Sequence, residues 1–344
     1  MPTSTDASGK HSFFYSPKLS LWRIFRQLLP YLGSSLFIWL LLRQIGFRAV
    51  WRLLSSVDMS WLFVGFGWYL LTNILRSYRF GTLLTFGYWK PLRLLPDMIL
   101  LSFLNNVLPA RSGELTFPYL LQRRHNIPLG DGLTYLLIVR IFDLLAVATL
   151  FIVFALLERH QLANSVSQAL SSVSFLLLPV LLMLAALPWL GSYCLLLGEK
   201  LLRLLRLDER QNGQKLLALG QRIVVAMRQV HHADTYSRVF LWSILGWLTT
   251  FAWFAAFLRA IHLPTPYPLV IVGATFATIS KAIPLVTVGG FGVHEAGWSL
   301  GFLLVGMSLE TAVASGFAVN MLTLVTSITL TGFTSIWLGK TRQC

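Results

Sequence analysis

Cysteine and acidic residues are both scarce in this chain. Among 344 residues there are 2 cysteines, Cys194 in an apolar run and Cys344 at the end, so the sequence holds no disulfide framework and no cysteine-based metal spacing. The 13 acidic residues are outnumbered by 28 basic ones, and charged residues make up 12% of the chain. That share is about half of what a soluble domain carries, which argues against an ordinary soluble fold.

Motifs for enzymatic chemistry are also missing. His294-Glu295 could begin the zinc-protease pattern HExxH, but Trp298 stands where the second histidine belongs. No Ser/His/Asp, paired-carboxylate or nucleotide-binding pattern occurs elsewhere in a supporting context. We therefore expect no enzyme, no catalytic residue, no metal site and no cofactor.

Long hydrophobic runs are what the sequence does contain. Hydrophobic residues make up 56% of the chain, and the mean hydropathy is +0.68. A helix needs about 20 apolar residues to cross about 30 Å of hydrocarbon. Runs of that kind occupy residues 28–46, 59–76, 131–157, 166–197, 239–260 and 313–338. The sequence therefore predicts an all-α, polytopic transmembrane helix bundle with about six full crossings.

Two further apolar segments, 94–124 and 267–309, are interrupted near their middles by proline, glycine and acidic residues, which a lipid-facing helix does not carry. A full crossing at 94–109 would place the basic stretch before it outside, against the positive-inside rule, once the basic segment 198–238 is inside. We therefore expect both segments to be re-entrant, the first from the cytoplasmic side and the second from the outer side. The basic residues of 43–52 count against this topology. Opposed broken segments are typical of inverted-repeat transporters.

The predicted organisation has three parts. Residues 1–27 form a cytoplasmic N-terminal segment, residues 28–339 form the transmembrane domain, and residues 340–344 form a cytoplasmic tail. The basic start of the chain is similar to a signal peptide, but no small-residue cleavage site follows the first run, so we expect an uncleaved first helix. Within the domain, 198–238 forms either interfacial amphipathic helices or a solvated cytoplasmic loop.

The net charge of +15 helps to predict the binding partners and the cellular location of the protein. Without a soluble domain to bind nucleic acid, the charge is better explained by basic cytoplasmic loops and by attraction to anionic lipid headgroups. We expect a multi-pass protein of the bacterial inner membrane, with both termini in the cytoplasm. Its expected partners are membrane lipids, and a lipid-modifying enzyme or glycosyltransferase is a second candidate.

The first polar constellation is the stretch NNVLPARSGE at 105–114. Pro109 and Gly113 break the helix and free backbone groups, and Arg111 and Glu114 lie beside them at a spacing that allows pairing. Charged side chains at membrane depth cost about 2.5–3.5 kcal/mol, so those that are present usually pair or line a polar cavity. The alternative is a loop at the level of the headgroups, where charges cost little.

The second constellation runs from Lys281 to Glu295 and contains the stretch GGFG at 289–292. Glycines there allow positive φ, and their free amides can form an anion-binding concavity at the N-terminus of a helix. Such a site would suit a phosphate headgroup, although a GGxG run alone is often only a turn. Its place in an apolar segment, between Lys281 and His294, favours function.

Two other groups of residues have simpler interpretations. Arg140 and Asp143 share a helix face and can form an ion pair, either as a structural contact in the bundle or as part of a substrate path. Arg76 and Arg79, at the end of the second crossing, are expected to extend to lipid phosphates at the interface. The tryptophans at the ends of the crossings are typical of interfacial belts.

With these residues, the chain resembles the lysylphosphatidylglycerol synthase transmembrane family of flippase-like membrane proteins. The motifs that carry the resemblance are NNxLPARxGE at 105–114, RxxD at 140–143 and IPxxxxGGFGVxE at 283–295. The resemblance implies a helical membrane fold with re-entrant segments that moves or holds a lipid between leaflets. In full-length synthases a cytosolic aminoacyl-transfer domain follows this region, so we do not expect synthase activity here.

The leading hypothesis is lipid translocation, with a phospholipid or lipid-linked headgroup in a cavity between the two broken segments. The alternative is a non-transporting subunit that presents a lipid to a separate glycosyl- or acyltransferase, and an intramembrane transferase is a third, for which no nucleophile–base pair is present. The candidate lipid-binding residues are Asn105, Asn106, Arg111, Glu114, Arg140, Asp143, Lys281, Gly289, Gly290, Gly292, His294 and Glu295.

Overall fold

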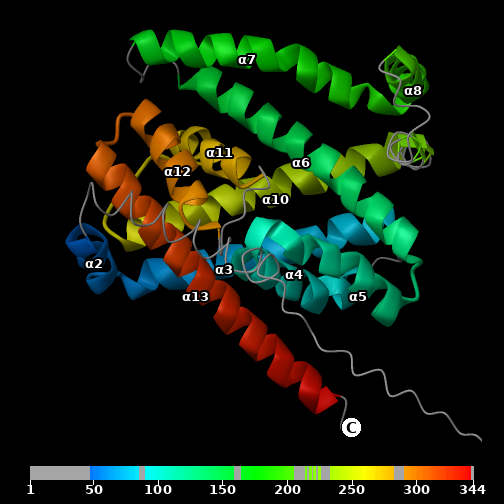
Figure 1. The fold of residues 1–344 in the computed structure, drawn as a ribbon. Coiled ribbons are helices and arrows are strands. Elements are labelled where there is room, and N and C mark those ends of the chain that lie inside the picture. The colour runs from blue at the N-terminus through cyan, green and yellow to red at the C-terminus, as the bar shows by residue number, and fades with distance from the viewer. Residues whose placement is uncertain are drawn as a thin grey trace, which may run out of the picture.

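The computed structural model of the chain describes residues 47–84, 90–158, 164–204, 233–282 and 290–341, with scattered positions between 214 and 225. Within these residues every regular element is a helix and none is a strand, which confirms the all-α prediction (Figure 1). The first predicted crossing, 28–46, and most of the basic segment 198–238 lie outside the described residues.

Among the described residues, three helices are long and apolar enough to cross a membrane: α6 (Leu129–Leu157), α10 (Ala233–Ala260) and α13 (Leu309–Thr341). They contain the predicted crossings 131–157, 239–260 and 313–338. The predicted crossing 59–76 lies within a fourth long helix, α3 (Met59–Leu83), which continues past its expected end. The structure thus supports a multi-pass membrane protein, while the number of crossings stays a prediction.

The predicted crossing 166–197 is not one continuous helix. It is divided between α7 (Asn164–Ala185) and α8 (Leu187–Leu204), with a turn at Ala186. Pro179 lies inside α7, and a second proline lies in the first turn of α8. Each proline lacks a backbone N–H and crowds the preceding turn, which weakens a continuous helix. In Figure 1, α7 runs along the edge of the molecule beside α6.

Helices α3 and α10 pack side by side through the middle of the bundle (Figure 1). Their close approach depends on Gly65, because a Cβ there would lie 2.5 Å from Cδ1 of Phe257. The start of α3 is fixed by Asp58, whose carboxylate accepts the Ser60 N–H at 2.8 Å as an N-cap. The buried polar residues of α3 are Thr72, Asn73, Ser77 and Arg79. This helix therefore brings a polar face into the protein interior.

The predicted broken segment 94–124 forms a helical hairpin. The 3₁₀ turn η1 (Lys90–Leu94) leads into α4 (Leu95–Val107), η2 (Pro109–Leu115) forms the break, and α5 (Thr116–His125) returns. At the break, Gly113 lies against the end of α4, where a Cβ would be 2.7 Å from the backbone nitrogen of Asn105. Only glycine fits this contact without a shift of the backbone.

The open ends of this hairpin are joined by a buried carboxylate. Asp97, in the first turn of α4, accepts from Arg124 Nη1 at 2.5 Å and lies 2.8 Å from His125 Nε2. Both partners are in the last turn of α5. Acidic groups stabilise the N-terminus of a helix and basic groups its C-terminus, so the contact suits both helix dipoles.

The second broken segment, 267–309, also folds back on itself. It consists of α11 (Tyr267–Ala282) and α12 (Val293–Leu304), which pack closely together (Figure 1). Residues 283–289 lie outside the described residues. After them, Gly290 and Gly292 adopt φ values of 67° and 87°, which suit glycine and confirm the positive φ expected there.

Aromatic side chains fill the space between these elements. Trp253, Phe254 and Phe257 of α10 lie in one buried cluster with Trp298 and Phe302 of α12. Large apolar residues are also exposed, and Phe175 on α7 is 79% exposed. Apolar faces of this kind suit lipid as the surrounding solvent. The short helix α2 (Phe47–Ser55) packs on α13.

Candidate functional site

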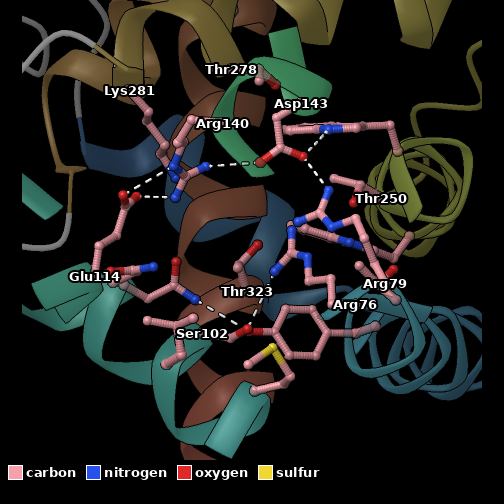
Figure 2. Close-up of a pocket in the computed structure, with 18 of the residues that line it drawn as sticks. Arg76, Arg79, Ser102, Glu114, Arg140, Asp143, Thr250, Thr278, Lys281 and Thr323 are labelled. Atoms are coloured by element: carbon pink, nitrogen blue, oxygen red, sulfur yellow. Dashed lines mark hydrogen bonds and ion pairs between the residues drawn. The ribbon is translucent and has the colours of Figure 1, made fainter. Parts of the chain in front are cut away.

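A central cavity of about 150 Å³ lies where the two broken segments meet the long helices. A single water needs roughly 10–15 Å³ measured in this way, so the cavity holds a larger group or several waters. Glu114 lines it from the break of the first hairpin, and Lys281 and His294 line it from the two sides of the second break. Residues of α3, α4, α6, α10 and α13 complete the wall (Figure 2).

The described lining residues carry an excess of positive charge. The basic ones are Arg76, Arg79, Arg140 and Lys281, and the acidic ones are Glu114 and Asp143. Figure 2 shows these side chains directed toward one another from α3, α6, α11 and the first break. With histidine neutral, the cavity wall has two more positive than negative charges, so it favours an anionic occupant.

Asp143 connects three elements at the cavity wall. Its Oδ1 accepts from Arg79 Nη1 at 2.5 Å and from Trp247 Nε1 at 2.8 Å. Its Oδ2 accepts from Arg140 Nη1 at 3.1 Å, which confirms the ion pair predicted from their spacing on one helix. One carboxylate therefore compensates parts of two guanidinium groups and orients an indole of α10.

Arg140 also reaches the first break. Its Nε donates to Glu114 Oε2 at 3.0 Å, and its Nη2 contacts Glu114 Oε1, so the two side chains form a bidentate pair. Such pairs fix geometry as well as charge. The sequence allowed Glu114 to pair with Arg111, whose side chain lies outside the described residues. The pair with Arg140 ties the broken hairpin to the long helix α6.

The prediction that Arg76 and Arg79 reach the membrane interface is wrong. Helix α3 continues to Leu83, so both arginines lie inside the helix rather than at its end, and both line the central cavity. Arg79 is 5% exposed and paired with Asp143. Arg76 donates to Ser102 Oγ at 3.3 Å, and no carboxylate among the described side chains lies within 4 Å of it.

The described residues on the two sides of the second break are joined by a chain of hydrogen bonds. Lys281 Nζ donates to Asn320 Oδ1 at 3.3 Å, and Asn320 Nδ2 donates to Glu295 Oε1 at 2.9 Å. The other oxygen of Glu295 accepts the Gly292 N–H at 2.6 Å. The carboxylate, which is 0% exposed, therefore caps the start of α12 from within the protein. The Gly292 amide, a candidate anion donor in the sequence, already has this internal acceptor.

Buried polar atoms without a hydrogen-bond partner gather around the cavity. They are Arg79 Nε, Asn105 Oδ1, Trp253 Nε1 and both ring nitrogens of His294, all on residues that line it. In the described part of the chain only Ser174 Oγ adds to this set elsewhere. Most buried polar groups in proteins are hydrogen-bonded, so this concentration marks the cavity wall as the polar region of the described interior whose hydrogen bonds are least complete.

The structure brings most of the predicted site residues to one place. Those that line the cavity are Asn105, Asn106, Glu114, Arg140, Asp143, Lys281 and His294. Those placed near the second break without lining it are Gly290, Gly292 and Glu295. The side chain of Arg111 and all of Gly289 lie outside the described residues.

Two kinds of lining residue were missed by the sequence analysis. The first is the arginine pair of α3, whose signal was helical spacing: Arg76 follows Thr72 by four residues and Asn73 by three, and Arg79 follows Arg76 by three. The second is the set of aromatic and hydroxyl residues of α10, including Trp247 and Trp253, which resemble ordinary membrane residues in sequence.

One comparison with known proteins gives a match. The family model described as the lysylphosphatidylglycerol synthase TM region matches residues 27–330. No curated protein and no solved structure shows detectable similarity to the chain. The matched range contains both hairpins and every described residue that lines the cavity.

Proposed function

The chain belongs to the lysylphosphatidylglycerol synthase transmembrane family, and from this premise we propose that it binds an anionic lipid headgroup in the central cavity and moves it between leaflets. The proposal concerns a phospholipid or a lipid-linked phosphate, because phosphate is the anionic group that lipid headgroups share. In it the protein is a translocase and not an enzyme, resides in a bacterial inner membrane, and has both termini in the cytoplasm.

The observation that carries the proposal is Arg76. Its guanidinium is a cavity-lining cation whose one described hydrogen bond goes to a neutral serine hydroxyl at 3.3 Å. A cation inside a membrane protein is costly unless a counter-charge or water compensates it. A phosphate would supply that counter-charge, since guanidinium groups bind phosphate oxygens through two parallel hydrogen bonds.

The two broken hairpins give the cavity its second relevant property. Glu114 and Lys281 reach it from different hairpins, and the bidentate pair of Glu114 with Arg140 joins one hairpin to α6. Backbone interruptions at membrane depth are tolerated where they line a cavity. A headgroup bound in the cavity would therefore contact two separate broken segments, and in this proposal their displacement accompanies translocation.

We predict that Arg76→Gln slows lipid movement at least tenfold in proteoliposomes. The reason is the loss of a charge-assisted hydrogen bond, which is worth about 1.5–3 kcal/mol. The measurement follows fluorescently labelled phosphatidylglycerol and phosphatidylethanolamine by dithionite quenching from outside. Arg76→Lys should keep part of the rate, because the charge remains.

A matched control is Arg238→Gln, which removes an exposed arginine near the start of α10, away from the cavity. It should move lipid at the parental rate. Equal rates for Arg76→Gln and the parent would sink the proposed role of the cavity. If the folded parent binds labelled lipid but moves none, the non-transporting subunit that presents lipid to a separate transferase becomes the better proposal.

A further inference from the structure

A second hollow, of about 330 Å³, lies along α3 and α10 and shares no lining residue with the central cavity. It is lined by Trp61, Trp68, Leu248, Thr249, Ala252, Ala255, Ala256, Arg259 and Tyr267. We call this hollow the alanine groove, because three alanines of α10 form its floor. Small side chains leave room along a helix that larger ones would fill.

One end of the alanine groove carries a cation. Arg259 is exposed, its guanidinium lies 4.7 Å from the ring centroid of Trp61, and no described carboxylate is within 4 Å of it. A basic residue in the last turn of α10 also suits the helix dipole. The helix dipole of α10 therefore accounts for a basic residue at this position. It does not account for the alanine groove that begins beside Arg259.

The length of the groove matches one leaflet of a bilayer. From Arg259 back to Leu248, α10 rises about 16 Å at 1.5 Å per residue. That is about half of a hydrocarbon core roughly 30 Å thick. Trp61, Trp68 and Tyr267 border the groove, and such amphipathic rings concentrate where headgroups meet acyl chains. If the alanines of the groove lie at the depth of the acyl chains, Arg259 lies at the depth of the lipid phosphates.

The inner end of the groove is closed toward the cavity. Thr249, which lines the groove, accepts a hydrogen bond at 2.9 Å from Thr72, which lines the cavity. The two hollows are thus neighbours separated by a pair of hydroxyl groups. An occupant of the groove does not need to enter the cavity.

We infer that the alanine groove binds one phospholipid, with its phosphate on Arg259 and one acyl chain along Ala252, Ala255 and Ala256. The charge, the aromatic border and the length select a phospholipid over a peptide or a free phosphate. An apolar hollow offers a free phosphate nothing beyond Arg259. The inference does not depend on the role proposed for the central cavity.

The test counts phospholipid bound to the purified full chain by native mass spectrometry, with dioleoylphosphatidylglycerol added in detergent. Arg259→Gln removes the cation, and Ala255→Leu fills the groove while leaving the cation in place. In an Arg76→Gln background, which weakens the lipid site proposed in the central cavity, each should lower the fraction of chain that carries one bound lipid at least tenfold. Arg259→Lys should retain part of the binding, because a point charge still attracts phosphate.

Two comparisons separate this site from others. Arg238→Gln, at the opposite end of the same helix, should bind lipid as the parent does, and Arg76→Gln reports on the central cavity independently. Circular dichroism and size exclusion check that each variant is folded, and Arg259→Gln changes only an exposed side chain. If Arg259→Gln or a folded Ala255→Leu binds lipid as well as the parent chain does, the inference is overturned. The bound lipid would then not need both the cation and the apolar part of the groove.

Discussion

Asp143 is the residue on which the charges of the cavity depend most directly. Its side chain is 11% exposed, that of Arg79 is 7% exposed, and their atoms lie 2.5 Å apart. Breaking a buried ion pair by removing one partner leaves the other charge without compensation, which costs about 3–5 kcal/mol. An exposed ion pair contributes much less, because water screens both charges.

We predict that Asp143→Asn lowers the free energy of unfolding by about 3 kcal/mol, because Arg79 then lies buried beside a neutral amide. The measurement is thermal or denaturant unfolding in detergent micelles. A double variant with Arg79→Gln should lose less than the sum of the single losses, because it removes both charges together.

The control at this scale is Glu199→Gln on α8. Glu199 pairs with Arg203 one turn away, and their side chains are 42% and 64% exposed. Its loss should be below about 1 kcal/mol. Equal losses for Asp143→Asn and Glu199→Gln would show that Asp143 has no special role in stability.

The sequence could reveal part of this network. Arg140 and Asp143 are one helical turn apart, so their pairing follows from spacing alone. The pair of Arg79 with Asp143 joins α3 to α6, and that of Arg140 with Glu114 joins α6 to the first hairpin. Neither pair follows from local spacing, because each depends on how separate elements pack. The residue types in the sequence indicated a polar site. The packing of separate helices determined which residues form ion pairs there.

At the scale of elements, glycines determine how closely the arms of the second hairpin approach. A Cβ on Gly297 would lie 2.7 Å from the carbonyl oxygen of Phe276, and one on Gly301 would lie 2.8 Å from the carbonyl carbon of Gly273. The spacing of Gly297 and Gly301 is that of the GxxxG motif, which lets membrane helices meet backbone to backbone. The hairpin therefore presents Lys281 and His294 from two nearly touching helices.

We predict that Gly301→Ala destabilises the protein by about 1–3 kcal/mol, the usual cost of overpacking. The effect should appear as a lower unfolding temperature in detergent. The same change at Gly67, where nothing lies within 4 Å of an added Cβ, should be neutral or slightly stabilising, because alanine favours a helix. A neutral Gly301→Ala would mean that the two helices can separate at no cost.

The elements show where sequence patterns succeed and where they stop. Proline, glycine and charge predicted both breaks, because these residues interrupt an apolar helix whatever surrounds it. Hydropathy did not predict the division between α7 and α8, since no charged residue interrupts the run 166–197, although a proline follows the turn at Ala186 by two residues. It also ended α3 too early, because the following residues are polar but face the interior.

At the scale of the whole molecule, the two hairpins are far apart in the sequence, yet Glu114 of the first break and Lys281 and His294, which flank the second, line one cavity. The opposed re-entrant topology expected from charge bias remains a prediction. This prediction states from which side of the membrane each broken segment enters. The chain charge of +15 is consistent with basic loops on the cytoplasmic side.

We predict opposite labelling for single cysteines placed at Ser112 and Thr287 in a background without Cys194 and Cys344. If the two breaks open to different faces, as the charge bias predicts, a membrane-impermeant thiol reagent should reach Ser112→Cys only from the cytoplasm and Thr287→Cys only from outside. The measurement uses right-side-out spheroplasts and inside-out vesicles. Labelling of both positions from one face would refute the inverted arrangement and favour the non-transporting alternative.

The hydrogen bonds of Asn320 have one further consequence. An amide has an acceptor on one side and donors on the other, and here the oxygen meets Lys281 while the nitrogen meets Glu295. Rotating the amide by half a turn would place oxygen against carboxylate and nitrogen against ammonium, so both contacts would become repulsive. The lysine and the cap of α12 therefore hold the same side chain in one orientation. A change at the cavity wall that draws Lys281 away would remove one of the two contacts that set this orientation and leave the amide held by its contact to Glu295.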